Sequence, residues 1–280
     1  MLVDEIFKRC ISSLSPLYDT DEATRITEWV FEDILNIHFS EVKNHLNDDL
    51  TDRQQKKLTD RLVRLMQSEP VQYVLGYAYF MDLKLNVNKN VLIPRPETEE
   101  LVDLVIKQNP SFKGTVVDIG TGSGCIALSL SKKLKGATVY ASDVSEDAIC
   151  IASKNSAENQ LSCQFIHDSI LNPDLDKYPN VDLIVSNPPY IEKKESVEMH
   201  DNVLKHEPHL ALFANEHPLE FYTAILKFAQ HKLTKQGSVY LELNPVYAND
   251  VAALFSNAGF ALVQIHDDLS GKKRFLSCVN

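Results

Sequence analysis

The sequence lacks the features that are typical of membrane, secreted and zinc-binding proteins. No stretch approaches the roughly 18 consecutive apolar residues of a membrane-spanning helix. The N-terminus has acidic residues ahead of basic ones and no continuous apolar segment after them, which argues against a secretory signal. The five cysteines are scattered without a C-x-x-C pair, so neither a disulfide framework nor a zinc site is predicted. We therefore expect a cytoplasmic protein with no membrane segment and no bound metal.

Positive charge is also scarce. The chain has 28 Lys and Arg residues against 39 Asp and Glu residues, a net charge of −11. Non-specific binding to phosphates needs many basic side chains that displace counterions, so we expect no stable binding to nucleic acid. The 280 residues, 44% apolar and 24% charged, are typical of a globular protein with one large domain and a smaller attachment. We expect a monomer.

Glycine is absent from residues 1–75, and apolar residues there recur at helical spacing. Asp33 alone interrupts the apolar positions around it. Thr20 or Asp21 can cap one helix and Thr51 another, and Pro70 ends the pattern. Residues 1–70 are therefore predicted to form a helical bundle.

Residues 71–92 alternate between apolar and polar positions and are rich in Tyr, Val and Phe. This pattern predicts a β-hairpin that joins two domains, with its turn at Met81 and Asp82. After Pro94 and Pro96, the acidic start of ETEELVDLVIKQ indicates the first turn of a helix.

From Thr115 onward, candidate strands alternate with Gly-rich turns and helical stretches. The candidates are residues 115–120, 137–143, 163–168, 181–186, 238–243, 262–267 and 274–279. This order predicts an α/β fold for residues 93–280, with a mainly parallel, doubly wound seven-stranded sheet. The last two strands are too close in sequence for a crossover helix, so we expect them to be antiparallel.

The first of these strands runs into a Gly-rich loop, Asp118-Ile119-Gly120-Thr121-Gly122-Ser123-Gly124. Dinucleotide-binding proteins have G-x-G-x-x-G, but Cys125 stands where the last glycine would fall, so the spacing favours a nucleoside ligand without a pyrophosphate. Asp143 ends the second strand, where a carboxylate can accept both hydroxyls of a ribose. Asp168 ends the third strand, where it could meet an adenine amino group.

These strand-end features resemble the class I S-adenosylmethionine-dependent methyltransferases over about residues 91–280. The resemblance implies S-adenosylmethionine as cofactor and a Rossmann-like sheet whose last strand is antiparallel. The residues that it implies for cofactor binding are Gly120, Thr121, Gly122, Ser123, Gly124, Asp143, Val144, Asp168, Ser169 and Asn187. Asp168 is followed by Ser169, with Ile170 as a possible substitute for a larger side chain that stacks on the adenine.

The fourth strand leads directly into Asn187-Pro188-Pro189-Tyr190. Two prolines make a rigid loop and remove two backbone donors, so carbonyls remain as acceptors beside the Asn187 carboxamide. The Asn187 side-chain oxygen and the Pro188 carbonyl can accept both N–H bonds of a planar NH₂ group, and the Tyr190 ring can stack on it. An amide nitrogen is a poor nucleophile, so orienting it toward the methyl donor supplies most of the catalysis.

This tetrapeptide resembles both the adenine-N6 nucleic-acid methyltransferases and the protein glutamine methyltransferases. Residues 70–76 (PVQYVLG) and 92–99 (LIPRPETE), together with the order of domains, closely resemble the bacterial peptide chain release factor glutamine methyltransferases. The resemblance implies methylation of the side-chain amide nitrogen (N5) of glutamine in the Gly-Gly-Gln motif of class 1 release factors, with residues 1–70 recognising the substrate. It places Asn187, Pro188 and Tyr190 in catalysis, and these three with Pro189 and Arg95 at the substrate. Adenine-N6 methylation of DNA or RNA stays the alternative.

Further features have a structural and a functional interpretation. Arg95 could close over the substrate or pair with Glu97. His206-Glu207-Pro208 resembles the family's Tyr-Glu-Pro. Basic residues at helical spacing form either a solvated helix face or a docking surface for the release factor; they are Arg53, Lys56, Lys57, Arg61 and Arg64.

Overall fold

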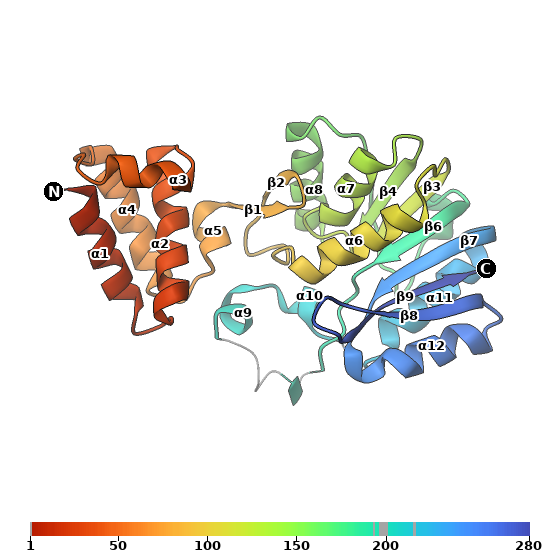
Figure 1. Ribbon diagram of the computed structural model, residues 1–280. Coiled ribbons are helices and arrows are strands. Elements are labelled where there is room, and N and C mark those ends of the chain that lie inside the picture. Colours follow the sequence, from red (N-terminus) through yellow and green to blue (C-terminus); the bar gives the residue numbers. More distant parts are fainter. Residues whose placement is uncertain (1, 193, 196–200, 215–216) are drawn as a thin grey trace. The chain divides into compact units, whose positions relative to one another are not determined.

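A computed structural model of the chain describes residues 2–192, 194–195, 201–214 and 217–280, and these form two compact units (Figure 1). The first comprises residues 2–77 and 201–206, and the second comprises the remaining described residues. No helix in the described part of the chain has both the length and the apolar character needed to cross a membrane.

The first unit is a helical bundle. Its helices are α1 (Val3–Leu14), α2 (Thr20–Leu35), α3 (Phe39–Val42), α4 (Asp52–Leu65), α5 (Val71–Leu75) and α9 (Asp201–His206). The apolar faces of α1, α2, α4 and α5 meet in one core, which includes Leu14, Phe31 and Leu65. Asp19, rather than Thr20 or Asp21, caps α2 by accepting a hydrogen bond from the Glu22 amide. Thr51 caps α4 as predicted and forms a capping box with Gln54.

The basic residues of α4 do not share one solvent-exposed face. Arg61 is buried, and its guanidinium lies 2.5 Å from the carboxylate of Asp33, which also accepts a 2.8 Å hydrogen bond from Lys57. Burial acts to raise the pKa of Asp33, but these two hydrogen bonds outweigh it and lower the pKa. Arg64 pairs with Glu69 inside the same unit. Asp33, the charge that interrupts the apolar positions of α2, is therefore an ion-pair partner of Arg61 and Lys57, and Arg61 is the one of these two cations that is buried.

The expected hairpin over residues 71–92 is shorter than predicted. Its strands are β1 (Tyr77–Phe80) and β2 (Leu83–Asn86), and they meet at the predicted turn, where Met81 has φ +50°. Residues 71–75 form α5 instead, because Pro70 begins the helix and Gly76, at φ +84°, ends it. Burial of α5 against the bundle overrides the strand preference of its Val and Tyr residues. The larger unit starts at residue 78, within the hairpin.

The second unit contains the predicted seven-stranded sheet. The strands are β3 (Thr115–Ile119), β4 (Thr138–Asp143), β5 (Gln164–His167), β6 (Val181–Ser186), β7 (Leu233–Glu242), β8 (Ala261–Asp267) and β9 (Lys273–Val279). Their order is β5-β4-β3-β6-β7-β9-β8. Strands β3 to β7 are parallel, and β9 is antiparallel to both of its neighbours. The predicted α/β sheet with an antiparallel last strand is confirmed.

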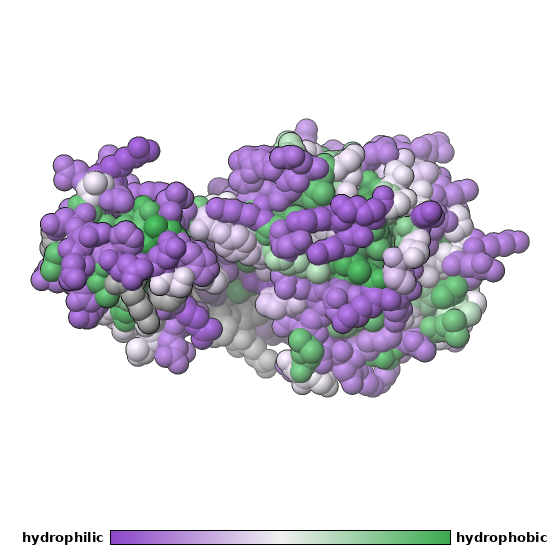
Figure 2. Space-filling view, turned by 45° about the horizontal axis from the view of Figure 1, so that its top comes forward, coloured by the Kyte–Doolittle hydropathy of each residue, from purple (hydrophilic) through white to green (hydrophobic). Residues whose placement is uncertain are grey.

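Helices cover both faces of this sheet (Figure 1). The helices are α6 (Pro96–Gln108), α7 (Cys125–Lys133), α8 (Glu146–Glu158), α11 (Glu220–Lys232) and α12 (Ala248–Asn257), and a further short helix, α10 (His209–Leu212), lies in the same unit. Successive strand residues point to opposite faces, so Val116 packs in the core with α6 and α7 while Val117 packs in the core with α11 and α12. Hydrophilic residues predominate on the surface in Figure 2, with smaller apolar areas among them.

Candidate active site

The candidate site lies where the parallel strands end. Ile119 at the end of β3 is in register with Ser142 of β4 and Ser186 of β6, so the loops that follow these strands emerge at one edge of the sheet. There they line a cavity of about 290 Å³. The predicted site residues that line it are Gly120, Gly122, Asp143, Val144, Asp168, Ser169, Asn187, Pro188 and Pro189.

The glycines of the loop after β3 have two different functions. Gly120 and Gly122 have φ values of +75° and +53°, and a Cβ at either would meet no atom within 4 Å. Glycine is needed there because of the backbone conformation, while the space above stays open to the cavity. Gly124 also has a left-handed backbone, at φ +84°, but a Cβ there would lie 3.2 Å from the side chains of Ala152 and Leu128. Gly124 therefore permits close packing of α7 against α8.

Two carboxylates hold this loop in place. Asp118 is buried, and its Oδ2 accepts hydrogen bonds from the Thr121 hydroxyl (2.6 Å) and the Ala127 amide (3.2 Å). Among the described residues its Oδ1 has no partner, and burial raises the pKa of Asp118 to about 7. Asp143 accepts the Gly122 amide at one oxygen (2.8 Å) and the Ser145 amide at the other (2.9 Å). Asp143 also lines the cavity.

Asp168, which follows β5, was predicted to be available to an adenine amino group, but its carboxylate has partners within the protein. Asp168 lines the cavity, but its carboxylate already accepts the Asp174 amide (3.0 Å) and pairs with Lys177 (3.4 Å). Ser169 also lines the cavity and offers no large apolar face. Apolar residues do line the cavity nearby, and they include Ile170, Leu210, Ala211 and Ile225.

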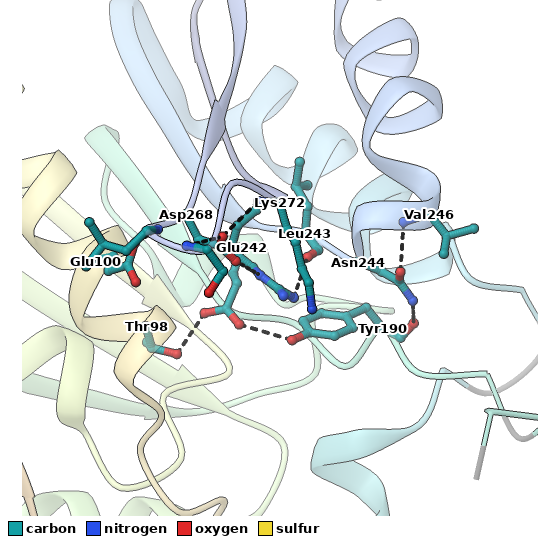
Figure 3. A network of polar contacts seen from close by, with 12 residues as sticks. Thr98, Glu100, Tyr190, Glu242, Leu243, Asn244, Val246, Asp268 and Lys272 are labelled. Atoms are coloured by element: carbon teal, nitrogen blue, oxygen red, sulfur yellow. Dashed lines mark hydrogen bonds and ion pairs between the residues drawn. The ribbon is translucent and has the colours of Figure 1, made fainter. Parts of the chain in front are cut away.

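The loop after β6 is held from behind by buried polar groups. Asn187 donates a 3.0 Å hydrogen bond from Nδ2 to Oγ1 of Thr98. The Tyr190 hydroxyl donates a 3.1 Å hydrogen bond to Oε1 of Glu242 (Figure 3). Tyr190 does not line the cavity, and burial raises the pKa of its hydroxyl above the usual value. Sequence reasoning assigned no function to Thr98 or Glu242, although a buried acid at the end of a strand is a detectable signal.

Arg95 contacts neither the cavity nor Glu97. Its guanidinium lies 2.5 Å from a carboxylate oxygen of the buried Glu207, whose other oxygen accepts the Ile93 amide at 3.2 Å. Glu207 thus ties the segment before α6 to the segment that begins α10. Thr121, Ser123 and Gly124 also lie outside the cavity lining.

Comparison with known proteins places this geometry in a family. The sequence model of a protein family described as "Methyltransferase small domain" matches residues 98–217. A second family model, described as "PrmC N-terminal domain", matches residues 5–76. A release factor glutamine methyltransferase from Lactococcus lactis is 41% identical over 89% of this chain and 92% of its own length. The chain belongs to the release factor glutamine methyltransferase family. A second member, from Bacteroides thetaiotaomicron, is 39% identical over 95% of each chain. The resemblance noted from the sequence is confirmed.

Solved structures agree with the fold of this methyltransferase. A methyltransferase from Pyrococcus furiosus has a TM-score of 0.55 at 18% identity and covers 79% of this chain and 98% of its own. A 16S rRNA methyltransferase from Thermus thermophilus has a TM-score of 0.52 at 18% identity and covers 73% of this chain and 49% of its own. At this identity the likeness shows the fold alone.

The cofactor of this methyltransferase is S-adenosylmethionine, as expected from the sequence. The residues present fit it, because the open Gly loop lets a ligand approach the backbone and the Asp143 oxygens can accept ribose hydroxyls. Apolar residues around Ile170 provide a surface for a base. When bound, the cofactor supplies an electrophilic methyl group on a sulfonium. No group of three or more His, Cys, Asp or Glu that could hold a metal occurs in the part of the chain that is described.

Proposed function

We propose that this enzyme methylates the side-chain amide nitrogen (N5) of the glutamine in the Gly-Gly-Gln motif of class 1 peptide chain release factors. The observation that carries the proposal is the position of Asn187, Pro188 and Pro189 on the wall of the cofactor cavity. Because Nδ2 of Asn187 donates to Thr98, the other atom of the carboxamide, Oδ1, is left to accept a hydrogen bond. The Pro188 carbonyl is a second acceptor.

These acceptors account for the chemistry that a glutamine amide needs. Its nitrogen lone pair is delocalised into the carbonyl, so the nitrogen is weakly nucleophilic. Two acceptors that hold both N–H bonds fix the plane of the amide and orient the lone pair toward the methyl donor. Methyl transfer leaves an extra proton on the nitrogen, and because an N-protonated amide is a strong acid, that proton passes to water. The proposal therefore requires no strong general base at the nitrogen.

The helical unit is proposed to recognise the release factor. In the division predicted from the sequence, residues 1–70 are the recognition domain, residues 71–92 the linker and residues 93–280 the catalytic domain. Arg53 and Lys56 are exposed on α4 and can contact an acidic partner. We further propose that the enzyme is a cytoplasmic monomer that binds no nucleic acid stably. The net charge of −11 supports the last point.

Parallel methyl-transfer reactions test the substrate. Labelled S-adenosylmethionine is supplied with purified release factor, with the same factor carrying Gly-Gly-Ala in place of Gly-Gly-Gln, and with duplex DNA. Label on the unaltered factor alone supports the proposal. Label on DNA would contradict it and favour the adenine-N6 alternative, which shares the planar NH₂ group.

A further inference from the structure

Two buried polar side chains lie behind the substrate loop, Asn187–Tyr190, and contact it. Thr98 lies in the first turn of α6, and Glu242 is the last residue of β7. Each is only 2% exposed, although both are polar. A buried carboxylate is destabilising unless its oxygens are hydrogen-bonded, so Glu242 requires donors from the surrounding residues.

The hydrogen bonds run in one direction toward Glu242. Its Oε2 accepts the Thr98 hydroxyl at 2.7 Å, and its Oε1 accepts the Tyr190 hydroxyl at 3.1 Å (Figure 3). Thr98 Oγ1 in turn accepts Nδ2 of Asn187 at 3.0 Å. One carboxylate therefore contacts both ends of the Asn187–Tyr190 loop, directly at Tyr190 and through Thr98 at Asn187.

This polarity determines which atom Asn187 presents. Burial raises the pKa of Glu242, whereas the hydrogen bonds from the Thr98 and Tyr190 hydroxyls and the charge of Arg274 act to lower it. The ionised carboxylate can only accept, so in this state the single proton of the Thr98 hydroxyl is committed to Glu242. Thr98 can then only accept from Asn187, which requires Nδ2 on that side and Oδ1 on the other. With the opposite orientation, Asn187 would present N–H donors to a substrate NH₂ group that itself needs acceptors.

We propose that Thr98 and Glu242 are positioning residues that fix the orientation of the Asn187 carboxamide, so that its oxygen is presented to the substrate amide. The inference rests on the proposed function, since it concerns how Asn187 holds an NH₂ group. Neither residue lines the cofactor cavity. Their loss should therefore lower kcat and leave cofactor binding unchanged.

The test compares Thr98→Val, which removes the hydroxyl at nearly the same size, with Thr98→Ser, which retains it. We expect Thr98→Val to lower kcat roughly 10- to 100-fold, the scale of misplaced catalytic groups, and Thr98→Ser to stay within about 3-fold of wild type. KM for S-adenosylmethionine should not change. Thr27→Val is the matched control, because Thr27 is equally buried but lies in the helical unit. Equal kcat values for Thr98→Val and Thr98→Ser would overturn the inference.

Two further measurements keep the test decisive. If Thr98→Val does not fold, Glu242→Gln serves instead, because it keeps the shape but adds donors, and a wild-type kcat in that variant would refute the inference. The side-chain amide signals of Asn187, followed by NMR without any substrate, should shift in Thr98→Val and not in Thr98→Ser. Unchanged signals in both would also overturn the orienting role. Failure of the wild-type enzyme to label release factor would refute the proposed function instead. The NMR measurement uses no substrate, so it would still test the orientation of Asn187.

Discussion

At the scale of single residues, Asn187 is the side chain on which the proposed reaction depends. Replacement by Ala removes a loop acceptor and almost no core volume, so Asn187→Ala should lower single-turnover methyl transfer to release factor by at least about 100-fold. The melting temperature should change little. Asn249→Ala, at an exposed position of α12, is the control. Near-normal transfer by the Asn187 variant would contradict the mechanism.

Burial of Asp118 predicts that the free energy of unfolding depends on pH. Burial raises its pKa from 3.8 to about 7, and the neighbouring charge of Asp143 acts in the same direction. The folded state therefore keeps a proton that the unfolded chain loses, so this residue's contribution to stability is present below pH 3.8 and is lost as pH rises toward 7. Asp118→Asn should flatten this decline in the free energy of unfolding. Calorimetry across that window measures it, with the exposed Asp267→Asn as control. An unchanged slope in the Asp118 variant would refute the assignment.

Residue positions could be predicted from sequence better than residue contacts. Gly120, Gly122, Asp143 and Asn187 follow strands of a parallel sheet, so their meeting at one edge follows from the topology. The partners of Arg95 and Tyr190 did not follow, because each is a side chain that is distant in sequence. Glu242, which contacts Tyr190, is such a partner. Those of Asp168 lie in the loop that follows it, whose conformation the sequence pattern does not specify.

At the scale of elements, helix α4 depends on its N-terminal cap. The Thr51 hydroxyl accepts the Gln54 amide, and the Gln54 side chain accepts the Thr51 amide. Thr51→Ala should destabilise the helical unit by about 1 kcal/mol. Thr59→Ala is the matched control, because Thr59 lies exposed within the same helix and Ala has the higher helix propensity.

Trp29 lets this prediction be measured in the helical unit alone. It is the chain's single tryptophan and lies in α2, so its fluorescence reports unfolding of that unit during a urea titration. The midpoint should fall for Thr51→Ala and stay level or rise for Thr59→Ala. Equal midpoints for the two variants would show that the capping box contributes nothing to stability.

Element types were predictable where periodicity and end signals agreed. In the seven strands and the helices between them, the periodicity and the end signals indicated the same element. The capping signal of Thr51 likewise identified the start of α4. Residues 71–75 contain Val and Tyr at alternating positions, so strand preference and helix ends conflicted. Pro70 and Gly76 mark the ends of a helix that the composition alone does not indicate.

At the scale of the whole molecule, the exposed cations proposed to dock the release factor lie on the helical unit, while the catalytic cavity lies on the other unit. The chain is acidic overall, yet exposed cations remain on α4 after Arg61 and Arg64 are taken by internal acids. A local cationic surface on an acidic protein favours an acidic partner surface and disfavours general binding to nucleic acid. The catalytic cavity lies wholly within the second unit. Docking and chemistry can therefore be perturbed separately.

Charge reversal of Arg53 and Lys56 to Glu should therefore raise KM for release factor roughly 3- to 10-fold at low salt, while kcat at saturation stays unchanged. The difference from wild type should shrink as salt is added, since exposed charges are screened. Lys135 and Lys235, exposed on the other unit, give a matched control when reversed to Glu. Both double variants move the net charge from −11 to −15, because each reversal changes it by −2. An equal rise in KM for both would attribute the effect to net charge and contradict docking on α4.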